Sequence, residues 1–273
     1  MFVSNRTLLR DPRRFAQRCR AAAEDRGWEP WFAPDPVADS PALTRLAIVP
    51  LGTANLAARA LGVPARADRA IDAGFDGRDR RIDLGHLTCA DEAGKGPAAG
   101  TGTEEGGTVF AAMAGIGLDA AVVGAARQQV KRRLGWMAYA AAGVTQLRWP
   151  ACDFSVQLDD EEPLRRRARC VVVGNAGLLP GGFTLLPGAQ LDDGLLDVGI
   201  LAPSGAWGWM RVAGRVLAHG GRQDRELERF QAGRVQVSVE VDLPRQVDGE
   251  IVAPGRTLSV SVCPSALTVR RPR

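Results

Sequence analysis

The stretch that constrains this chain most runs from residue 171 to residue 198 and reads VVVGNAGLLPGGFTLLPGAQLDDGLLDV. Its apolar, β-branched start predicts a buried strand, and the glycines and the proline that follow predict a tight loop. Two adjacent carboxylates, Asp192 and Asp193, then stand before a glycine and an alternating strand. Carboxylates beside exposed carbonyls at such a turn suit Mg²⁺ or Ca²⁺, whereas a solvated turn is the simpler interpretation of the motif by itself.

Size and composition indicate a folded protein with a mild positive charge. The 273 residues are 45% hydrophobic and 24% charged, and this length fits one large domain or two modest ones. The net charge of +4 favours an anionic ligand, such as lipid, nucleotide or nucleic acid, without choosing among them. Five scattered cysteines and two histidines argue against a zinc site and a disulfide framework, and they favour a reducing compartment.

No stretch of the sequence predicts a secretion signal or a membrane span. The N-terminus lacks a charged segment followed by an apolar one, and the most apolar run, 110–126, is short and interrupted by glycines. We therefore predict a cytoplasmic protein. Asp119 is the only charged residue of that run, so its carboxylate needs a compensating cation or hydrogen-bond donors if it is buried. The alternative is that it caps the start of a helix.

The first part of the chain alternates strand and helix patterns, as in βαβ units. A short apolar start precedes a helix that Pro12 opens and Gly27 closes, and Leu46–Pro50 reads as a further strand. The Gly52-Thr53-Ala54-Asn55 loop then leads into a helix beginning at Leu56. A loop of this kind offers backbone N–H groups and a positive helix end to anions, or it serves only as a helix cap.

After Pro150 the pattern changes to short alternating strands, which predicts a β-sandwich. Asp248-Gly249 lies between two of these strands and predicts a hairpin turn. The segment from Pro203 to Gly220 combines a broad apolar face with arginines. It reads either as a helix covering the sheet or as an interfacial element that reaches lipid.

Four motifs, in this order, resemble the diacylglycerol kinase catalytic-domain family, the bacterial lipid kinases and their sphingosine and ceramide kinase relatives. They are P-x-GT-x-N at 50–55, G-x-D-A at 117–120, PGA-x-x-DDGLLDV at 187–198 and V-DGE at 247–250. The resemblance covers nearly the whole chain and implies an α/β plus β fold. We expect a truncated Rossmann-like nucleotide domain over residues 1–72, to which 264–273 return, and a β-sandwich domain over 73–263.

The resemblance also implies a reaction, in which the γ-phosphate of ATP is transferred to a hydroxyl of diacylglycerol or a related lipid. Glu250, with Asp248 second, is the expected catalytic base. The implied ATP contacts are Gly52, Thr53 and Asn55, and the implied Mg²⁺ ligands are Asp193, Asp192, the Leu195 carbonyl and Asp119. The expected partner is a lipid at the inner membrane face, without nucleic acid, and a homodimer is left open.

One departure from the family pattern bears on the activity. The family's GGDGT phosphate loop occurs nowhere in the sequence, and the segment between Phe32 and Leu46 is too short for the elements that normally carry it. The chain is then either a shortened homologue or the product of a gene model that lost a segment. An inactive homologue that acts as a binding protein is therefore the main alternative. A soluble-metabolite kinase of the NAD-kinase type is another, but DDGLLDV points away from it.

Overall fold

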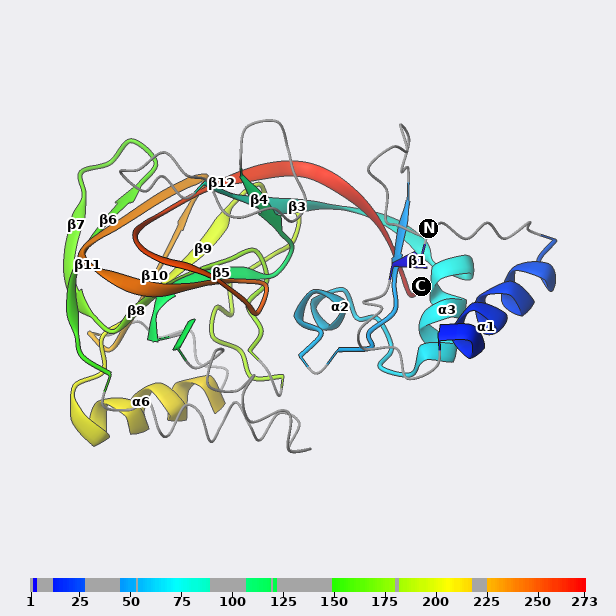
Figure 1. Cartoon of the computed structure of the whole chain (residues 1–273), viewed down its shortest axis with the longest axis horizontal. Coiled ribbons are helices and arrows are strands. Elements are labelled where there is room, and N and C mark those ends of the chain that lie inside the picture. The colour runs from blue at the N-terminus through cyan, green and yellow to red at the C-terminus, as the bar shows by residue number, and fades with distance from the viewer. Residues whose placement is uncertain are drawn as a thin grey trace. The chain divides into compact units, whose positions relative to one another are not determined.

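The computed structural model describes residues 2–3, 12–27, 45–52, 54–88, 107–118, 120–121, 149–179, 182–217 and 225–273 (Figure 1). The chain divides into two compact units. The first comprises Met1–Ile82 and Ser265–Arg273, and the second comprises Asp83–Pro264. The helix α3 (Ala67–Asp76), which spans the predicted boundary at residue 72, lies in the first unit.

The first unit contains a small parallel sheet with helices. Strand β1 (Phe2–Val3) pairs with β2 (Leu46–Ile48), and β2 pairs with the end of the long strand β12 (Glu250–Arg271). The remaining elements are α1 (Pro12–Glu24), α2 (Leu56–Ala60), α3 and the beginning of β3 (Arg78–Thr88). The helices predicted after Pro12 and from Leu56 are therefore confirmed.

Arginines hold the elements of the first unit together. Arg26, in the turn after α1, pairs with Asp72 and Asp76 of α3, and its guanidinium lies 5.3 Å from the centroid of the Phe75 ring. Arg270 of β12 donates to the Gly74 carbonyl over 3.0 Å and to the Asp79 carboxylate over 2.9 Å. These partners tie α1 and the last strand to the same helix, α3, and to the start of β3.

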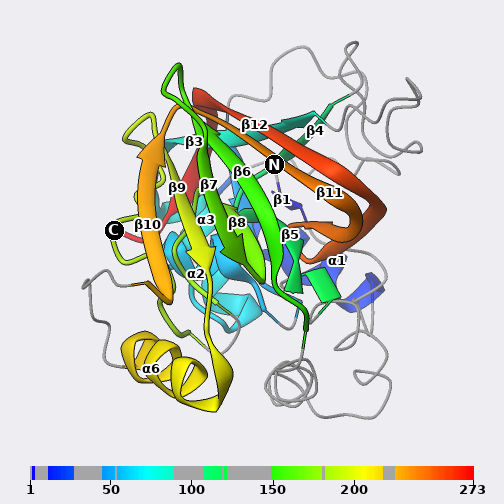
Figure 2. The same cartoon turned by 90° about the vertical axis from the view of Figure 1, so that its left-hand side faces the viewer.

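The second unit consists of antiparallel strands around one apolar core (Figure 2). Its elements are the rest of β3, β4 (Thr108–Phe110), β5 (Met113–Gly117), β6 (Cys152–Leu158), β7 (Leu164–Ala168), β8 (Cys170–Gly174), β9 (Leu196–Leu201), α6 (Gly205–Leu217), β10 (Leu227–Ala232), β11 (Arg234–Val247) and most of β12. The predicted α/β plus β fold is confirmed. Among the described residues, no helix has the length and apolar character needed to cross a membrane.

Strand β11 joins the β6–β7 pair to β5 and its neighbours because it changes partners along its length. Its first half pairs with β6, from Val235 opposite Leu158 to Val239 opposite Phe154. Its last residues, 245–247, pair with β5 instead, and the β11–β12 register shifts between Ser238 and Arg245. Such an irregularity bends a strand and lets it pass from one sheet to the next.

The buried arginine Arg245 fixes the bend at the end of β11. Its side chain is 1% exposed, and it donates to the carbonyls of Ala253 and Thr257, each over 2.8 Å. A Cβ at Gly255 would lie 2.6 Å from the guanidinium carbon, so only glycine fits there without a shift. The arginine therefore holds β12 closely against the strand end that leads into the Asp248-Gly249 turn.

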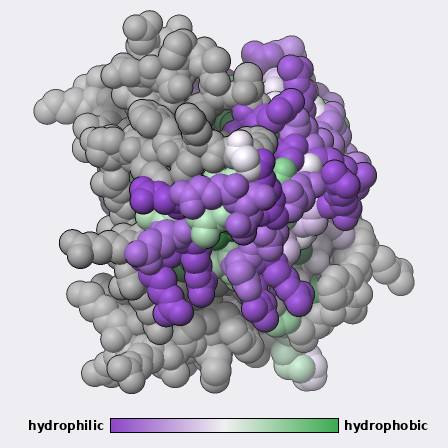
Figure 3. All heavy atoms as spheres, turned by 90° about the vertical axis from the view of Figure 1, so that its right-hand side faces the viewer, coloured by the Kyte–Doolittle hydropathy of each residue, from purple (hydrophilic) through white to green (hydrophobic). Residues whose placement is uncertain are grey.

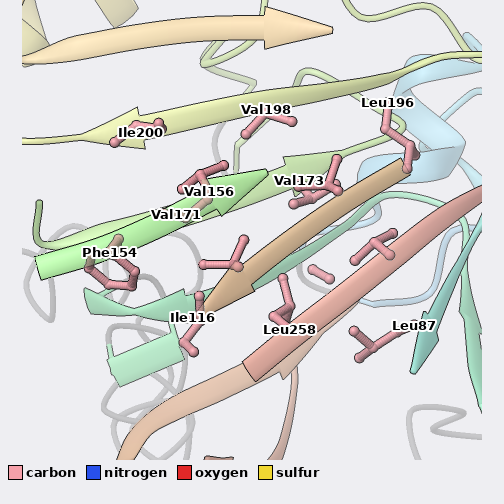
Figure 4. Packing of buried hydrophobic residues seen from close by; sticks show 14 of the residues in the cluster. Leu87, Ile116, Phe154, Val156, Val171, Val173, Leu196, Val198, Ile200 and Leu258 are labelled. Carbon is pink, nitrogen blue, oxygen red and sulfur yellow. The ribbon is translucent and has the colours of Figure 1, made fainter. Parts of the chain in front are cut away.

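The core of the second unit lies between strands β6, β8, β9 and β11 (Figure 4). Phe154 and Val156 of β6 face the same cluster as Val173 of β8 and Ile200 of β9. Every residue of β8 and of β9 is buried. Burial on both faces explains why β8 reads as a continuous apolar run, whereas β9 also buries a carboxylate, Asp197.

Shortening one side chain in this core should lower stability measurably. Ile200 is fully buried, and we expect Ile200→Val to lower the free energy of unfolding by about 1 kcal/mol, since it removes one packed methyl group. Urea denaturation measures the change. The same substitution at Ile251, which is 40% exposed, is the control and should have less than half that effect.

Candidate active site

The hairpin between β11 and β12 presents the V-DGE motif. Asp248 and Gly249 both adopt left-handed backbone angles, with φ of 46° and 81°, and Val247 pairs with Glu250 across the turn. Asp-Gly is the favoured pair for a two-residue turn of this type, so the predicted hairpin is confirmed. The Gln246 side chain accepts the Gly249 N–H over 2.8 Å. Glu250, the expected base, is exposed at the first position of β12.

The Asp248 carboxylate anchors this turn to the start of β5. Its two oxygens accept the backbone N–H groups of Ala111, Ala112 and Met113, each over 2.9 Å. The residue as a whole is exposed at the turn, but its carboxyl is desolvated, and this raises the pKa of Asp248. The negative charge of Glu250 also raises this pKa, whereas the three backbone N–H donors lower it. Asp248 thus serves as an acceptor that positions the turn, which leaves Glu250 as the better candidate for the base.

Asn175, directly after β8, joins the 111–113 segment to β3. It is 1% exposed, and its Nδ2 donates to the Asp83 carbonyl over 2.7 Å and to the Ala111 carbonyl over 3.2 Å. Its backbone N–H donates to the Ala112 carbonyl over 2.8 Å. Within the described part of the chain, its Oδ1 is buried without a hydrogen-bond partner. A buried amide oxygen of this kind commonly binds an ordered water.

Asp83 of β3 holds the loop that carries the acidic pair. It is 1% exposed, its carboxylate accepts the Gly194 N–H over 2.7 Å, and its own N–H donates to the Leu191 carbonyl over 2.6 Å. Inside the loop, Asp193 accepts the Leu195 N–H over 3.1 Å. The predicted turn at Asp192-Asp193-Gly194 is therefore real, and a buried carboxylate fixes its position.

These bonds form one polar chain that connects two motifs distant in the sequence. We call it the site network: Asp248, the backbone of 111–113, Asn175, Asp83 and the backbone of 191–194. All of its members belong to the second unit. The structure thus connects the predicted residues Asp248, Asp192 and Asp193, and it adds Asp83 and Asn175, which the sequence analysis did not single out. The signal for Asn175 is its place directly after an apolar strand, whereas Asp83 lies in a strand that begins with charged residues and gives no such signal.

The acidic loop offers oxygen ligands of the kind that Mg²⁺ prefers. Asp192 and Asp193 are both exposed, and the Leu195 carbonyl follows them. In the described ranges, no three His, Cys, Asp or Glu side chains gather as a metal cluster. Asp119, the fourth expected ligand, lies outside the described residues. The donors fit Mg²⁺ in chemical type, and a cation there would complete its coordination with carbonyls and water.

A further carboxylate, Asp197 of β9, lies beside this loop. It is 6% exposed, and its Oδ2 accepts a long hydrogen bond of 3.4 Å from Gln231. Burial, reinforced by the negative charge of Asp193, raises its pKa to about 6, while the Gln231 bond lowers it. Asp197 is therefore sensitive to any charge that is added at the acidic loop.

The raised pKa of Asp197 predicts a pH-dependent stability. Between its ordinary pKa of about 4 and the folded value of about 6, the folded state keeps a proton that the unfolded state has lost. Stability should therefore fall as the pH rises through this range, by up to about 3 kcal/mol. Asp197→Asn should remove this fall, as measured by urea denaturation at several pH values.

Titration of Asp197 with and without Mg²⁺ is a second test of this prediction. A cation bound at Asp193 would offset that carboxylate's charge and lower the pKa of Asp197, which carboxyl NMR titration reports directly. An Asp197 that titrates near its ordinary value in the absence of metal would contradict the electrostatic account.

The expected ATP loop lies in the first unit. The Asn55 side chain accepts the Gly52 N–H over 2.9 Å and donates back to the Gly52 carbonyl, and Asn55 itself has a φ of 49°. These bonds close the loop that precedes α2. Thr53 lies outside the described residues. The structure thus gives Asn55 a part in shaping the loop, and the ATP contacts stay a prediction.

Comparison with known families agrees with the motifs. Residues 112–271 match the YegS C-terminal NAD kinase beta sandwich-like domain, and residues 35–87 match the diacylglycerol kinase catalytic domain. The chain belongs to the diacylglycerol kinase catalytic-domain family. A relative from Pseudomonas fluorescens, named probable lipid kinase YegS-like, is 32% identical over 236 residues, which cover 86% of this chain and 71% of that protein. A relative of the same name from Pseudomonas aeruginosa is 34% identical over 236 residues, which cover 83% of this chain and 68% of that protein.

Solved structures support the fold of this family member. A structure from Bacillus anthracis str. Sterne has a TM-score of 0.63 at 20% identity and covers 83% of this chain and 68% of that chain. Another from the same strain, described as a diacylglycerol kinase, has a TM-score of 0.58 at 18% identity, with coverage of 83% and 66%. At these identities the similarity establishes the architecture alone.

Proposed function

We propose that this protein is a lipid kinase that transfers the γ-phosphate of ATP to a hydroxyl of diacylglycerol or a related lipid. The observation that carries the proposal is the site network, which connects the Asp248 turn and the acidic loop within one unit. Membership of a family whose relatives are named probable lipid kinases supports the same reaction class.

In this proposal Glu250 is the catalytic base. Phosphoryl transfer needs a positioned hydroxyl, a carboxylate within reach of its proton, and positive charge near the phosphates. Glu250 is exposed, and it directly follows a turn whose backbone is fixed through Asp248 and Gln246. Its carboxylate accepts the proton of the lipid hydroxyl, and Asp248 acts as a positioning residue.

The proposal assigns the metal and nucleotide contacts by residue. Asp193, Asp192 and the Leu195 carbonyl would hold Mg²⁺, with Asp119 as a further ligand, and the cation would offset the charge of the phosphates. Gly52, Thr53 and Asn55 would contact ATP. The protein would act in the cytoplasm on lipid at the inner membrane face. The proposal is compatible with a monomer or a homodimer.

The absence of GGDGT from the sequence favours a second candidate function, that of a lipid-binding protein without turnover. This loop supplies backbone donors to the phosphates in the family pattern, so a chain without it has fewer groups to hold ATP. The two candidates differ in one property, which is the consumption of ATP.

The test is transfer of labelled phosphate from ATP to lipid in mixed micelles with Mg²⁺. Diacylglycerol, ceramide and sphingosine are offered separately, and the lipid product is extracted and counted. Labelled lipid that forms with Mg²⁺, and does not form when EDTA is present, supports the kinase. The lipid that gains the most label is then the preferred substrate. Lipid binding without labelled product, in a protein that also fails to retain ATP in equilibrium dialysis, favours the binding protein.

A further inference from the structure

Helix α6 exposes two large apolar side chains on one face. Trp207 is 73% exposed and Met210 is 60% exposed, and they are the two most exposed large apolar side chains among the described residues. They are three positions apart, so they lie on the same side of the helix. Val212, on the other side, is 4% exposed.

The opposite face of α6 is the buried one. A Cβ at Gly208 would lie 3.1 Å from the Pro203 carbonyl carbon, so the helix rests closely on the segment that precedes it. Figure 2 shows α6 outside the strands, at the end where β9 leads into it. The helix is thus seated through Gly208 and Val212, which leaves Trp207 and Met210 facing away from the core.

Two arginines of α6 follow this apolar pair along the helix. Arg211 follows Met210, is half exposed, and forms an ion pair with Glu226. Arg215 follows one helical turn after Arg211. Exposed tryptophan and methionine beside several arginines are typical of helices that lie at an anionic lipid surface.

We propose that α6 is the membrane-docking element of this protein, with Trp207 and Met210 entering the interface of an anionic bilayer. This rests on the proposed function, since a lipid substrate lies within a bilayer. Tryptophan suits the bilayer interface because its ring is apolar and its N–H is polar. By contrast, the described residues on the face shown in Figure 3 are mainly hydrophilic, with only small apolar areas between them.

The size of the apolar pair argues for lipid rather than a second protein. A stable protein interface buries about 800 Å² on each partner, whereas two side chains offer a fraction of that area. Reversible insertion into a bilayer needs only a few apolar groups when charge attraction to anionic lipid adds to them. Arg215, together with the half-exposed Arg211, supplies positive charge on the same helix for that attraction.

Sedimentation with vesicles tests the docking directly. Wild-type protein should bind vesicles containing phosphatidylglycerol, and should bind them less in high salt or when only phosphatidylcholine is present. Trp207→Ala with Met210→Ala should weaken this binding by about tenfold or more. Val241→Ala, at a half-exposed valine of β11, is the matched control and should bind as wild type does. Circular dichroism checks that each variant is folded.

Activity assays separate this proposal from the proposed function. If the enzyme is active, the α6 double variant should lose turnover on vesicle-embedded diacylglycerol and keep it on a water-soluble, short-chain diacylglycerol. Vesicle binding that depends on α6 without any turnover would support the docking element and remove the kinase function. A double variant that binds anionic vesicles as wild type does would overturn the docking proposal. So would a variant whose only change is its oligomeric state in light scattering.

Discussion

Glu250→Gln is expected to lower the rate of lipid phosphorylation by roughly 10²–10⁴-fold, the usual contribution of a positioned general base. The amide occupies nearly the same volume but cannot accept the proton of the hydroxyl. Because Glu250 is exposed at the start of β12, we expect the fold and its stability to be unchanged. The rate is measured in mixed micelles with saturating ATP and Mg²⁺.

The control for this substitution is another exposed glutamate of the same hairpin. Glu240 lies on β11, and Glu240→Gln removes the same charge from the surface. It should keep the wild-type rate. A Glu250→Gln protein that turns over as fast as Glu240→Gln would show that Glu250 is not the base, and the roles proposed for this turn would have to be reassigned.

Asp248→Ala is expected to cause a large loss of stability, of about 3 kcal/mol or more. The substitution leaves the N–H groups of Ala111, Ala112 and Met113 without their acceptor, and an unsatisfied buried donor costs about 1–3 kcal/mol. It also places alanine at a φ of 46°, which aspartate tolerates better. Turnover should fall too, because Glu250 is carried by the released turn.

Asp159 provides a matched control for Asp248. It also sits at a turn with a φ of 49°, and its carboxylate accepts one backbone N–H, that of Arg234, over 2.8 Å. Asp159→Ala therefore has the same backbone cost with fewer lost hydrogen bonds. We expect it to be milder than Asp248→Ala by roughly 2 kcal/mol in urea denaturation. Equal losses at the two positions would contradict the anchoring role given to Asp248.

The elements that the sequence predicted well depend on residues close together in the chain. The buried strand predicted from Val171 is β8, and the Asp-Gly hairpin lies where its turn chemistry placed it. The acidic turn at 192–194 is likewise local. In each case neighbouring residues decide the backbone conformation, so a short pattern is sufficient.

The site network could not be predicted in the same way because its bonds join distant segments. Nothing around Asp248 shows that its carboxylate will meet the backbone of 111–113, and nothing around Asp83 indicates Gly194 as its partner. The change of partners along β11 also depends on long-range pairing. The resemblance therefore ranked Glu250 before Asp248 as the base, and the fold adds the hydrogen bonds that give Asp248 a positioning role.

Lipid phosphorylation by this protein is tested most directly by following the oxygen atoms of the transferred group. ATP labelled with ¹⁸O throughout its γ-phosphoryl group is incubated with the protein, Mg²⁺ and diacylglycerol, and the lipid product is weighed by mass spectrometry. A lipid kinase should yield a phosphorylated lipid that carries all the nonbridging ¹⁸O of that group, while the bridging oxygen comes from the lipid hydroxyl. Labelled inorganic phosphate without labelled lipid, or no reaction in a folded protein, would contradict this function.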